Sequence, residues 1–259
     1  MLADEVVLVS GLGAGLGSKL ATLAAAEGAK VIMAARSTDV MDEVGEQIAA
    51  AGGESVAVPC DVRDEEAVER LVATGVERFG AITGLVNSAY AHPGFDELLD
   101  TPERRLRRAM DVIYFGALNL TRAVVPHMRA AGRGSIVNIG TMATRKPAHG
   151  EAGYAAAKAA MSTATRYLAL ELGPHGIRVN QAILGWLDGP GVRFYIQMTA
   201  EERGVSEQEI YDEIAAQNPL GRIPTDEDCA RAVLPLLSRY CSEVTGASLD
   251  VNGGEYMPL

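Results

Sequence analysis

Tyr154 and Lys158 are the two side chains of this chain best suited to moving a proton. They lie four residues apart in the run YAAAK, and in a helix that spacing places both on one face. A nearby ammonium favours the phenolate form of tyrosine, so it is expected to lower the phenol pKa from about 10. The same spacing occurs on solvated helix faces, so other elements must show whether the pair meets a reactant.

A glycine-rich run lies between the first expected strand and the helix after it. Residues 5–10 (EVVLVS) are short, branched and apolar, which is typical of a strand buried on both faces, and SGLGAGLG continues to Gly17. Such a loop lets the backbone approach a pyrophosphate at the N-terminus of the next helix. The order Gly17-Ser18-Lys19 does not fit a P-loop. A tight turn with small residues for packing is the alternative.

Strands and helices alternate along the rest of the chain. Further strands are expected at 30–35, 54–59, 81–86, 134–139, 176–182 and 246–251. This alternation predicts an α/β, doubly wound Rossmann fold, with a seven-stranded parallel sheet flanked by helices on both faces. A helical region over 101–128 is expected to break near Pro126, and a helix is expected at 226–239. No repeat or linker divides the sequence, so residues 1–259 are expected to form one domain.

The composition indicates a globular protein and excludes several functions. Of 259 residues, 48% are apolar and 22% are charged, and the formal net charge is −11. That acidity argues against nucleic-acid binding. Cys60, Cys229 and Cys241 match no metal-ligand spacing, and their scatter fits reduced thiols in the cytoplasm. The cysteine spacing therefore predicts no metal site. No signal peptide or long apolar run is present, so we expect no membrane association.

Two residues that follow strands bear on the choice of dinucleotide. Arg36 follows the strand at 30–35, where a Rossmann unit usually has an acidic residue for the ribose 2′-hydroxyl. Because a guanidinium can bind a 2′-phosphate, we expect NADP(H) to be preferred, with NAD(H) possible. Stacking on adenine or exposure to solvent is the alternative for Arg36. Asp61 is expected to accept the adenine amino group or to cap the helix that begins near Asp64.

Over essentially its full length the chain resembles the short-chain dehydrogenase/reductase family. The resemblance rests on SGLGAGLG, CDV, NSAY, YAAAK, IRVN and the tail TGASLDVNGG. It implies an NAD(P)-dependent oxidoreductase that interconverts a ketone and a secondary alcohol by hydride transfer. Tyr154 would be the general acid and base, Lys158 would bind the nicotinamide ribose, and Thr141 would orient the substrate oxygen. A homo-oligomer, a tetramer or a dimer, is also implied.

The resemblance places cofactor contacts along the loops that follow the strands. They are Ser10, Gly11, Gly13, Gly15, Leu16, Gly17, Arg36, Asp61, Val62, Asn87, Ser88, Ala89, Tyr154, Lys158, Leu184 and Gly185.

Three positions depart from the family pattern. Ile113 stands where the family has an asparagine that holds a water-linked proton path behind the lysine. Tyr90 replaces a glycine and Leu184 replaces a proline. Asn119 is expected to project elsewhere and not to substitute for the missing asparagine. The alternative function is therefore a dinucleotide-binding protein with weak or no catalysis.

Apolar and aromatic residues after the strands predict a substrate site. Its candidate residues are Tyr90, His92, Met142 and Trp186. The segment at about 187–218 is expected to be a lid, and its apolar content indicates a fairly apolar small molecule. Packing of those side chains onto the core is the alternative. Glu151 is expected to cap the helix of Tyr154 in preference to contacting substrate.

Overall fold

A seven-stranded parallel sheet forms the centre of the computed structural model, which describes residues 1–258. The strand order is β3-β2-β1-β4-β5-β6-β7, and every neighbouring pair is parallel. The strands are β1 (Val6–Ser10), β2 (Lys30–Ala35), β3 (Ser55–Pro59), β4 (Gly84–Asn87), β5 (Gly134–Thr141), β6 (Ile177–Leu184) and β7 (Ser248–Val251). The predicted doubly wound fold is confirmed.

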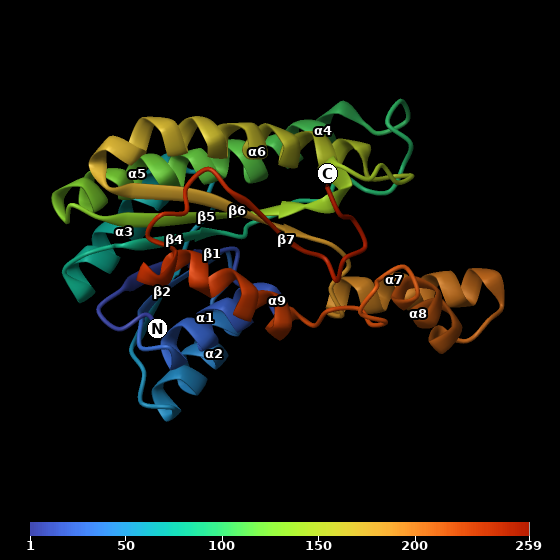
Figure 1. The fold of residues 1–259 in the computed structure, drawn as a ribbon, viewed down its shortest axis with the longest axis horizontal. Coiled ribbons are helices and arrows are strands. Elements are labelled where there is room, and N and C mark those ends of the chain that lie inside the picture. The colour runs from blue at the N-terminus through green and yellow to red at the C-terminus, as the bar shows by residue number, and fades with distance from the viewer. Residues whose placement is uncertain (259) are drawn as a thin grey trace.

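Helices cover both faces of the sheet (Figure 1). One face carries α1 (Leu16–Ala26), α2 (Asp39–Ala50) and α9 (Asp226–Val233). The other carries α3 (Glu65–Phe79), α5 (Gly116–Ala130) and α6 (Ala152–Leu172). Alternate residues of the strands point to the two sides, so Val7 and Val9 of β1 join one core while Val6 and Leu8 join the other. Each strand is therefore buried on both faces, as its apolar run predicts.

Local sequence explains where several helices begin and end. The Asp64 side chain caps α3 by accepting the N–H of Ala67 at 3.1 Å, and Gly80, with a φ of 82°, ends the same helix. Asp61 makes no bond that caps α3, so the prediction that Asp61 could cap this helix is wrong. In α9, Thr225 and Asp228 form a capping box.

The helical region after residue 101 does not break at Pro126, and this part of the prediction is wrong. The helix α5 continues through Pro126 to Ala130, because Val124 and Met128 on either side are fully buried. The irregularity lies earlier, where α4 (Glu103–Met110) passes through one π-helical turn, Asp111–Phe115, into α5. Likewise, the helix expected to reach residue 239 ends at Val233 and continues as the 3₁₀ turn Leu234–Leu237.

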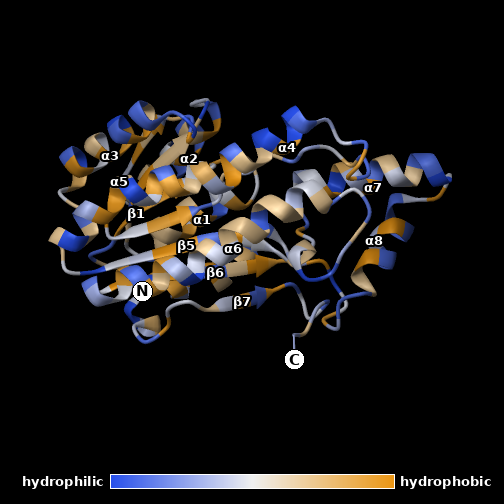
Figure 2. Ribbon diagram, turned by 90° about the horizontal axis from the view of Figure 1, so that it is seen from above, coloured by the Kyte–Doolittle hydropathy of each residue, from blue (hydrophilic) through white to orange (hydrophobic). Residues whose placement is uncertain are grey.

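The segment predicted to be a lid forms two helices, α7 (Pro190–Arg203) and α8 (Glu207–Ala215). They extend away from the sheet beyond β6 (Figure 1), and both helices carry a mixture of hydrophilic and hydrophobic residues (Figure 2). Ile196, Ile210 and Ile214 bury against one another in a small separate core. Within residues 1–258, no helix is long and apolar enough to cross a lipid bilayer.

Candidate active site

The glycine loop is pinned between two strands by contacts that leave no room for side chains. Gly11 has a φ of 76° and donates its N–H to the Ala34 carbonyl at 2.9 Å. A Cβ on Gly11 would lie 2.3 Å from the Ala89 nitrogen, and one on Gly17 would lie 2.6 Å from the Gly11 oxygen. Glycine is therefore required at both positions. Ser88 N–H also bonds the Ser10 carbonyl at 3.2 Å, which joins the loop to the end of β4.

The N-terminus of α1 suits a pyrophosphate. Its N-cap is Gly15, which makes no side-chain capping bond, and the first turn from Leu16 holds no acidic residue. The backbone around Gly13 is open, since a Cβ there would meet nothing within 4 Å. The N–H groups at the start of a helix and the helix dipole favour an anion at such a terminus. The loop residues thus fit the dinucleotide that the sequence predicts.

Asp226 lies beside this terminus, a position that its place at a helix start did not predict. A Cβ on Gly15 would be 3.1 Å from Asp226 Oδ2, and one on Gly189 would be 2.4 Å from the same atom. Burial raises the pKa of Asp226, and the neighbouring charge of Asp188 raises it further. A carboxylate thus lies next to the predicted pyrophosphate position.

The predicted adenine end of the site holds three charged side chains. Arg36 is exposed after β2. Asp61 is held by Arg63, whose Nη2 and Nε lie 2.6 Å and 3.0 Å from the carboxylate oxygens. These hydrogen bonds are the largest cause that lowers the pKa of Asp61 to about 2. Arg63 was not expected from the sequence. Val62 is buried beneath the start of α5, where a Cβ on Gly116 would lie 2.4 Å from it.

Tyr154, Lys158 and Thr141 come from two adjoining elements. Thr141 is the last residue of β5, and its Oγ1 accepts the Ala143 N–H at 3.3 Å. Tyr154 and Lys158 lie in the first turns of α6, which packs on β5. The Lys158 ammonium lies 5.6 Å from the centre of the Tyr154 ring and donates to the Ile139 carbonyl at 2.6 Å. Burial lowers the pKa of Lys158 to about 8.

The predicted lowering of the Tyr154 pKa by Lys158 is not found. Burial raises the pKa of Tyr154 well above its ordinary value, and the charge of Glu151 raises it further, followed by Tyr90. In the sequence, the neighbouring ammonium is the visible influence on the phenol. Desolvation is not visible there, because it depends on how the helix and the loops pack around the phenol.

A hydrogen-bond chain supports the inner wall of the site. The Thr165 hydroxyl donates to the Met161 carbonyl and accepts Asn138 Nδ2–H at 2.9 Å. The Asn138 Oδ1 therefore faces Asn87 and accepts its Nδ2–H at 2.8 Å. Because Asn87 is the donor at the end of this chain of hydrogen bonds, its Oδ1 is buried and, among the described residues, has no hydrogen-bond partner. The sequence named Asn87 as a cofactor contact, but its side chain turns into the protein.

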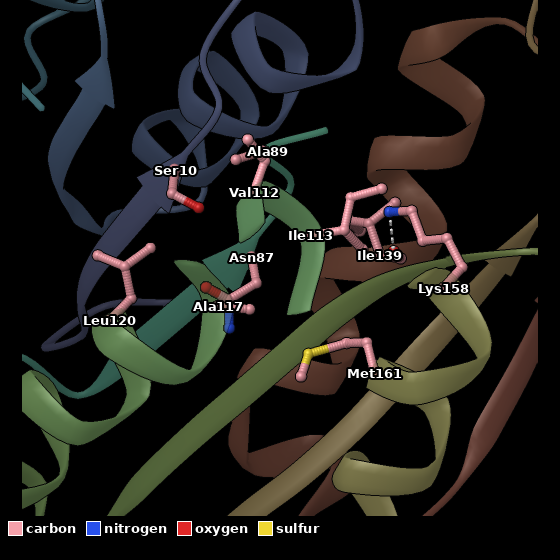
Figure 3. A pocket seen from close by; sticks show the side chains of 10 residues that line it. All are labelled: Ser10, Asn87, Ala89, Val112, Ile113, Ala117, Leu120, Ile139, Lys158 and Met161. Atoms are coloured by element: carbon pink, nitrogen blue, oxygen red, sulfur yellow. Dashed lines mark hydrogen bonds between the residues drawn. The ribbon is translucent and has the colours of Figure 1, made fainter. Parts of the chain in front are cut away.

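Asn87, Lys158 and Ile113 line one small cavity of about 10 Å³ (Figure 3). This volume is near the lower limit for a single water molecule. The remaining lining residues are Ser10, Ala89, Val112, Ala117, Leu120, Ile139 and Met161.

Ile113, the departure from the family pattern, lies in the π-helical turn and is buried. It packs with Ala109 and Ala157 against Tyr154. Its side chain cannot donate or accept a hydrogen bond. Asn119 does project elsewhere, as predicted, because its Nδ2–H bonds the Val62 carbonyl at 3.1 Å.

The predicted substrate residues fall into two groups. His92 lies close to the catalytic tyrosine candidate, with 5.2 Å between the centres of its ring and the Tyr154 ring. Tyr90 is mostly exposed nearby. Met142 instead packs on Gly185, where a Cβ would lie 3.3 Å from its sulfur. Trp186 packs into the small core of α7 and α8, with its ring centre 5.2 Å from that of Tyr195.

The loop after β6 begins with the predicted pair Leu184 and Gly185. Leu184 is buried at the end of β6, and a Cβ on Gly185 would lie 2.9 Å from the Asn252 Cβ. Glu151 occupies the N-cap position of α6 but makes no side-chain capping bond, so the capping prediction is wrong. Its carboxylate turns instead to His92, at 3.4 Å between Oε2 and Nε2.

Known proteins resemble this chain along most of its length. A family model described as enoyl-(acyl carrier protein) reductase matches residues 11–255. The chain belongs to the short-chain dehydrogenase/reductase family. The short-chain reductase protein NovJ of Streptomyces niveus is 36% identical over 252 residues, which is 97% of this chain and 94% of that protein.

Solved structures of family members share the fold closely. NAD⁺-bound xylitol dehydrogenase gives a TM-score of 0.90 at 27% identity, covering 98% of this chain and 99% of that one. A variant of actinorhodin polyketide ketoreductase with NADPH gives a TM-score of 0.90 at 31% identity, covering 97% of each. This short-chain dehydrogenase/reductase is therefore an oxidoreductase that uses a nicotinamide dinucleotide.

Proposed function

We propose that this enzyme interconverts a ketone and a secondary alcohol on a fairly apolar small molecule, with Tyr154 as the general acid and base. The observation that carries the proposal is the shared helix face of Tyr154 and Lys158, whose lysine bonds the Ile139 carbonyl of β5, the strand that ends at Thr141. The pinned glycine loop and the open N-terminus of α1 lie at the same carboxyl edge of the sheet.

Each side chain has a task that follows from its contacts. A bound nicotinamide would supply or accept the hydride. Tyr154 would give its phenolic proton to the carbonyl oxygen in reduction and would take a proton in oxidation. Lys158 donates one of its three N–H groups to Ile139, so the other two remain to hold ribose hydroxyls. Thr141 would donate its hydroxyl proton to the substrate oxygen.

The raised pKa of Tyr154 favours carbonyl reduction at neutral pH. A phenol whose pKa lies above its ordinary value stays protonated at neutral pH. It is therefore ready to act as an acid, which is the role that carbonyl reduction needs. Alcohol oxidation needs the phenolate and is expected to accelerate as the pH rises.

The proposed cofactor is NADP(H). Arg36 is exposed at the end of β2, and no acidic side chain within residues 1–258 forms an ion pair with it. Its guanidinium is thus free to meet a 2′-phosphate. Dissociation constants for NADPH and NADH, measured by calorimetry, test the proposal, and Arg36→Asp is expected to reverse the preference. Equal or tighter binding of NADH by the unaltered enzyme would refute it.

The lid and the assembly state also belong to this proposal. Apolar side chains of α7, among them Phe194 and Met198, are exposed and would cover an apolar substrate. On α6, Tyr167 and Leu170 are 63% and 74% exposed, which supports a homo-oligomer packed through this helix. Analytical ultracentrifugation would measure the assembly.

The decisive experiment replaces Tyr154 with phenylalanine. Tyr154→Phe is expected to lower kcat at least 100-fold across a panel of ketones, because general acid catalysis contributes about 10²–10⁴-fold. Tyr240→Phe is the matched control, since Tyr240 is 84% exposed and lies in none of the proposed sites. Undiminished turnover by Tyr154→Phe would exclude the assigned role.

The second candidate function, dinucleotide binding with weak catalysis, is favoured by Ile113. It predicts tight cofactor binding with no cofactor oxidation across the panel. A large gain in rate from Ile113→Asn would show that the side chain at this position limits the proton path.

A further inference from the structure

Glu151 and His92 form a polar pair that no step of the proposed mechanism uses. Their side chains are 26% and 20% exposed, and Glu151 Oε2 lies 3.4 Å from His92 Nε2. Gly94 donates its N–H to His92 Nδ1 at 3.2 Å, so Nδ1 is the acceptor. In the neutral ring the proton then lies on Nε2 and points to Glu151.

The backbone on both sides of this pair is tightly packed. A Cβ on Gly150 would lie 2.6 Å from the Phe95 carbonyl oxygen, and one on Gly153 would lie 3.0 Å from Pro93 Cγ. The ring of His92 also stacks on Phe95, with 4.4 Å between centres. The loop that carries His92 is thus fixed against the start of α6, which carries Glu151. Packing on both sides therefore holds the pair in place.

A second histidine–glutamate pair provides a comparison. His149 Nδ1 lies 2.8 Å from Glu97 Oε1, but these side chains are 98% and 65% exposed. Exposed pairs of this kind contribute little free energy. The Glu151 pair is more enclosed and therefore less screened by solvent.

The pair faces the reacting centre. The ring of His92 lies 5.2 Å from the ring of Tyr154, and Glu151 precedes Tyr154 by three residues on the same helix. Among the charged groups, Glu151 has the largest effect on the Tyr154 phenol. A carboxylate offers about four lone-pair positions, and the His92 N–H takes only one. Unused acceptor capacity is thus left beside the place where the substrate oxygen must bind.

We propose that Glu151, held in place by His92, binds a hydrogen-bond donor of the substrate, a hydroxyl or an ammonium group on the carbon next to the reacting one. This inference rests on the proposed function and narrows its substrate to an otherwise apolar molecule with one such donor. The donor would offset the negative charge of Glu151. Formation of the Tyr154 phenolate then becomes easier when the correct substrate is bound.

Three alcohols that share one ring test the inference. They are cyclohexanol, trans-cyclohexane-1,2-diol and trans-2-aminocyclohexanol, oxidised with NADP⁺ by the wild type and by Glu151→Gln. The wild type is expected to show a kcat/KM at least 10-fold higher for the diol or the amino alcohol than for cyclohexanol. Glu151→Gln is expected to remove that preference. Glu97→Gln, in the exposed pair, is the matched control and is expected to keep it.

The two donor substrates distinguish the chemistry of the ligand. The glutamine oxygen still accepts a hydroxyl, so a hydroxyl ligand loses less than an ammonium ligand when the charge is removed. The pH profile gives a second readout. With cyclohexanol, Glu151→Gln is expected to move the rise of kcat/KM to lower pH, because removal of a negative charge favours the phenolate.

The outcomes separate this inference from the proposed function. Equal selectivity in wild type and Glu151→Gln, together with loss of all turnover in Tyr154→Phe, would overturn the inference alone. Full turnover in Tyr154→Phe would overturn the proposed function. If none of the three alcohols is oxidised, calorimetry with the NADP⁺-loaded enzyme decides, and equal or undetectable binding of all three would overturn the inference.

Discussion

Lys158→Met is expected to remove the activity of the enzyme while leaving the protein as stable as the wild type, or slightly more stable, at neutral pH. Burial lowers the pKa of Lys158 from 10.5 to about 8. The folded state therefore binds this proton less tightly than the unfolded state. Below pH 8 the difference destabilises the fold by about 3 kcal/mol, at about 1.4 kcal/mol for each pKa unit.

The effect fades as the pH rises, because the unfolded chain also loses the proton near pH 10.5. The destabilisation is about 3 kcal/mol at pH 6.5 and about 1 kcal/mol at pH 9.5. Lys158→Met also loses the hydrogen bond to the Ile139 carbonyl, which contributes about 1.5–3 kcal/mol. The folded and unfolded pKa values already contain the whole pH dependence of this interaction, so the loss adds nothing to the predicted difference between the two pH values.

Guanidinium denaturation at pH 6.5 and pH 9.5 measures the difference. The stability of Lys158→Met relative to wild type should fall by about 2 kcal/mol between the two pH values. Lys30→Met is the control, because Lys30 is half exposed in a surface ion pair with Glu54. A relative stability of Lys158→Met that does not change with pH would show that the lysine is not desolvated as described.

Two other predictions concern the supports of the site. Asp226→Asn should tighten dinucleotide binding about 3–10-fold at pH 7, since it removes a carboxylate beside the α1 terminus. The affinity of the wild type for the dinucleotide should rise as the pH falls through the raised pKa of Asp226, and Asp226→Asn should not show that rise. Calorimetry measures both affinities, and Glu227→Gln is the control. Thr165→Val should lower the free energy of unfolding by about 1–3 kcal/mol, because Asn138 Nδ2 loses its buried acceptor. Thr163→Val, at an exposed threonine of the same helix, is the control. Equal free energies of unfolding for the two variants would count against the hydrogen-bond chain from Thr165 through Asn138.

Features with a short-range signal were predictable from the sequence. Alternation of apolar strands with helices, and the glycine run after β1, depend on neighbouring residues, so the fold and the predicted dinucleotide loop followed from them. Asp226 and Arg63 gave no such signal. Asp226 meets Gly15 only because α9 packs on α1 after more than 200 residues of intervening chain. The pKa of Tyr154 was assigned the wrong direction for a related reason, since burial is set by distant segments.

The strand order carries a consequence for how the enzyme acquires its site. β1 pairs with β2 and with β4, and β4 pairs with β5, whose last residue is Thr141. The groups around the site therefore come from segments more than a hundred residues apart. Pairing of such distant segments requires closure of long loops and is characteristically slow. A chain in which only some strands have paired does not yet contain a complete site. Enzymatic activity during refolding should therefore appear when the sheet is complete, and not when the first strands pair.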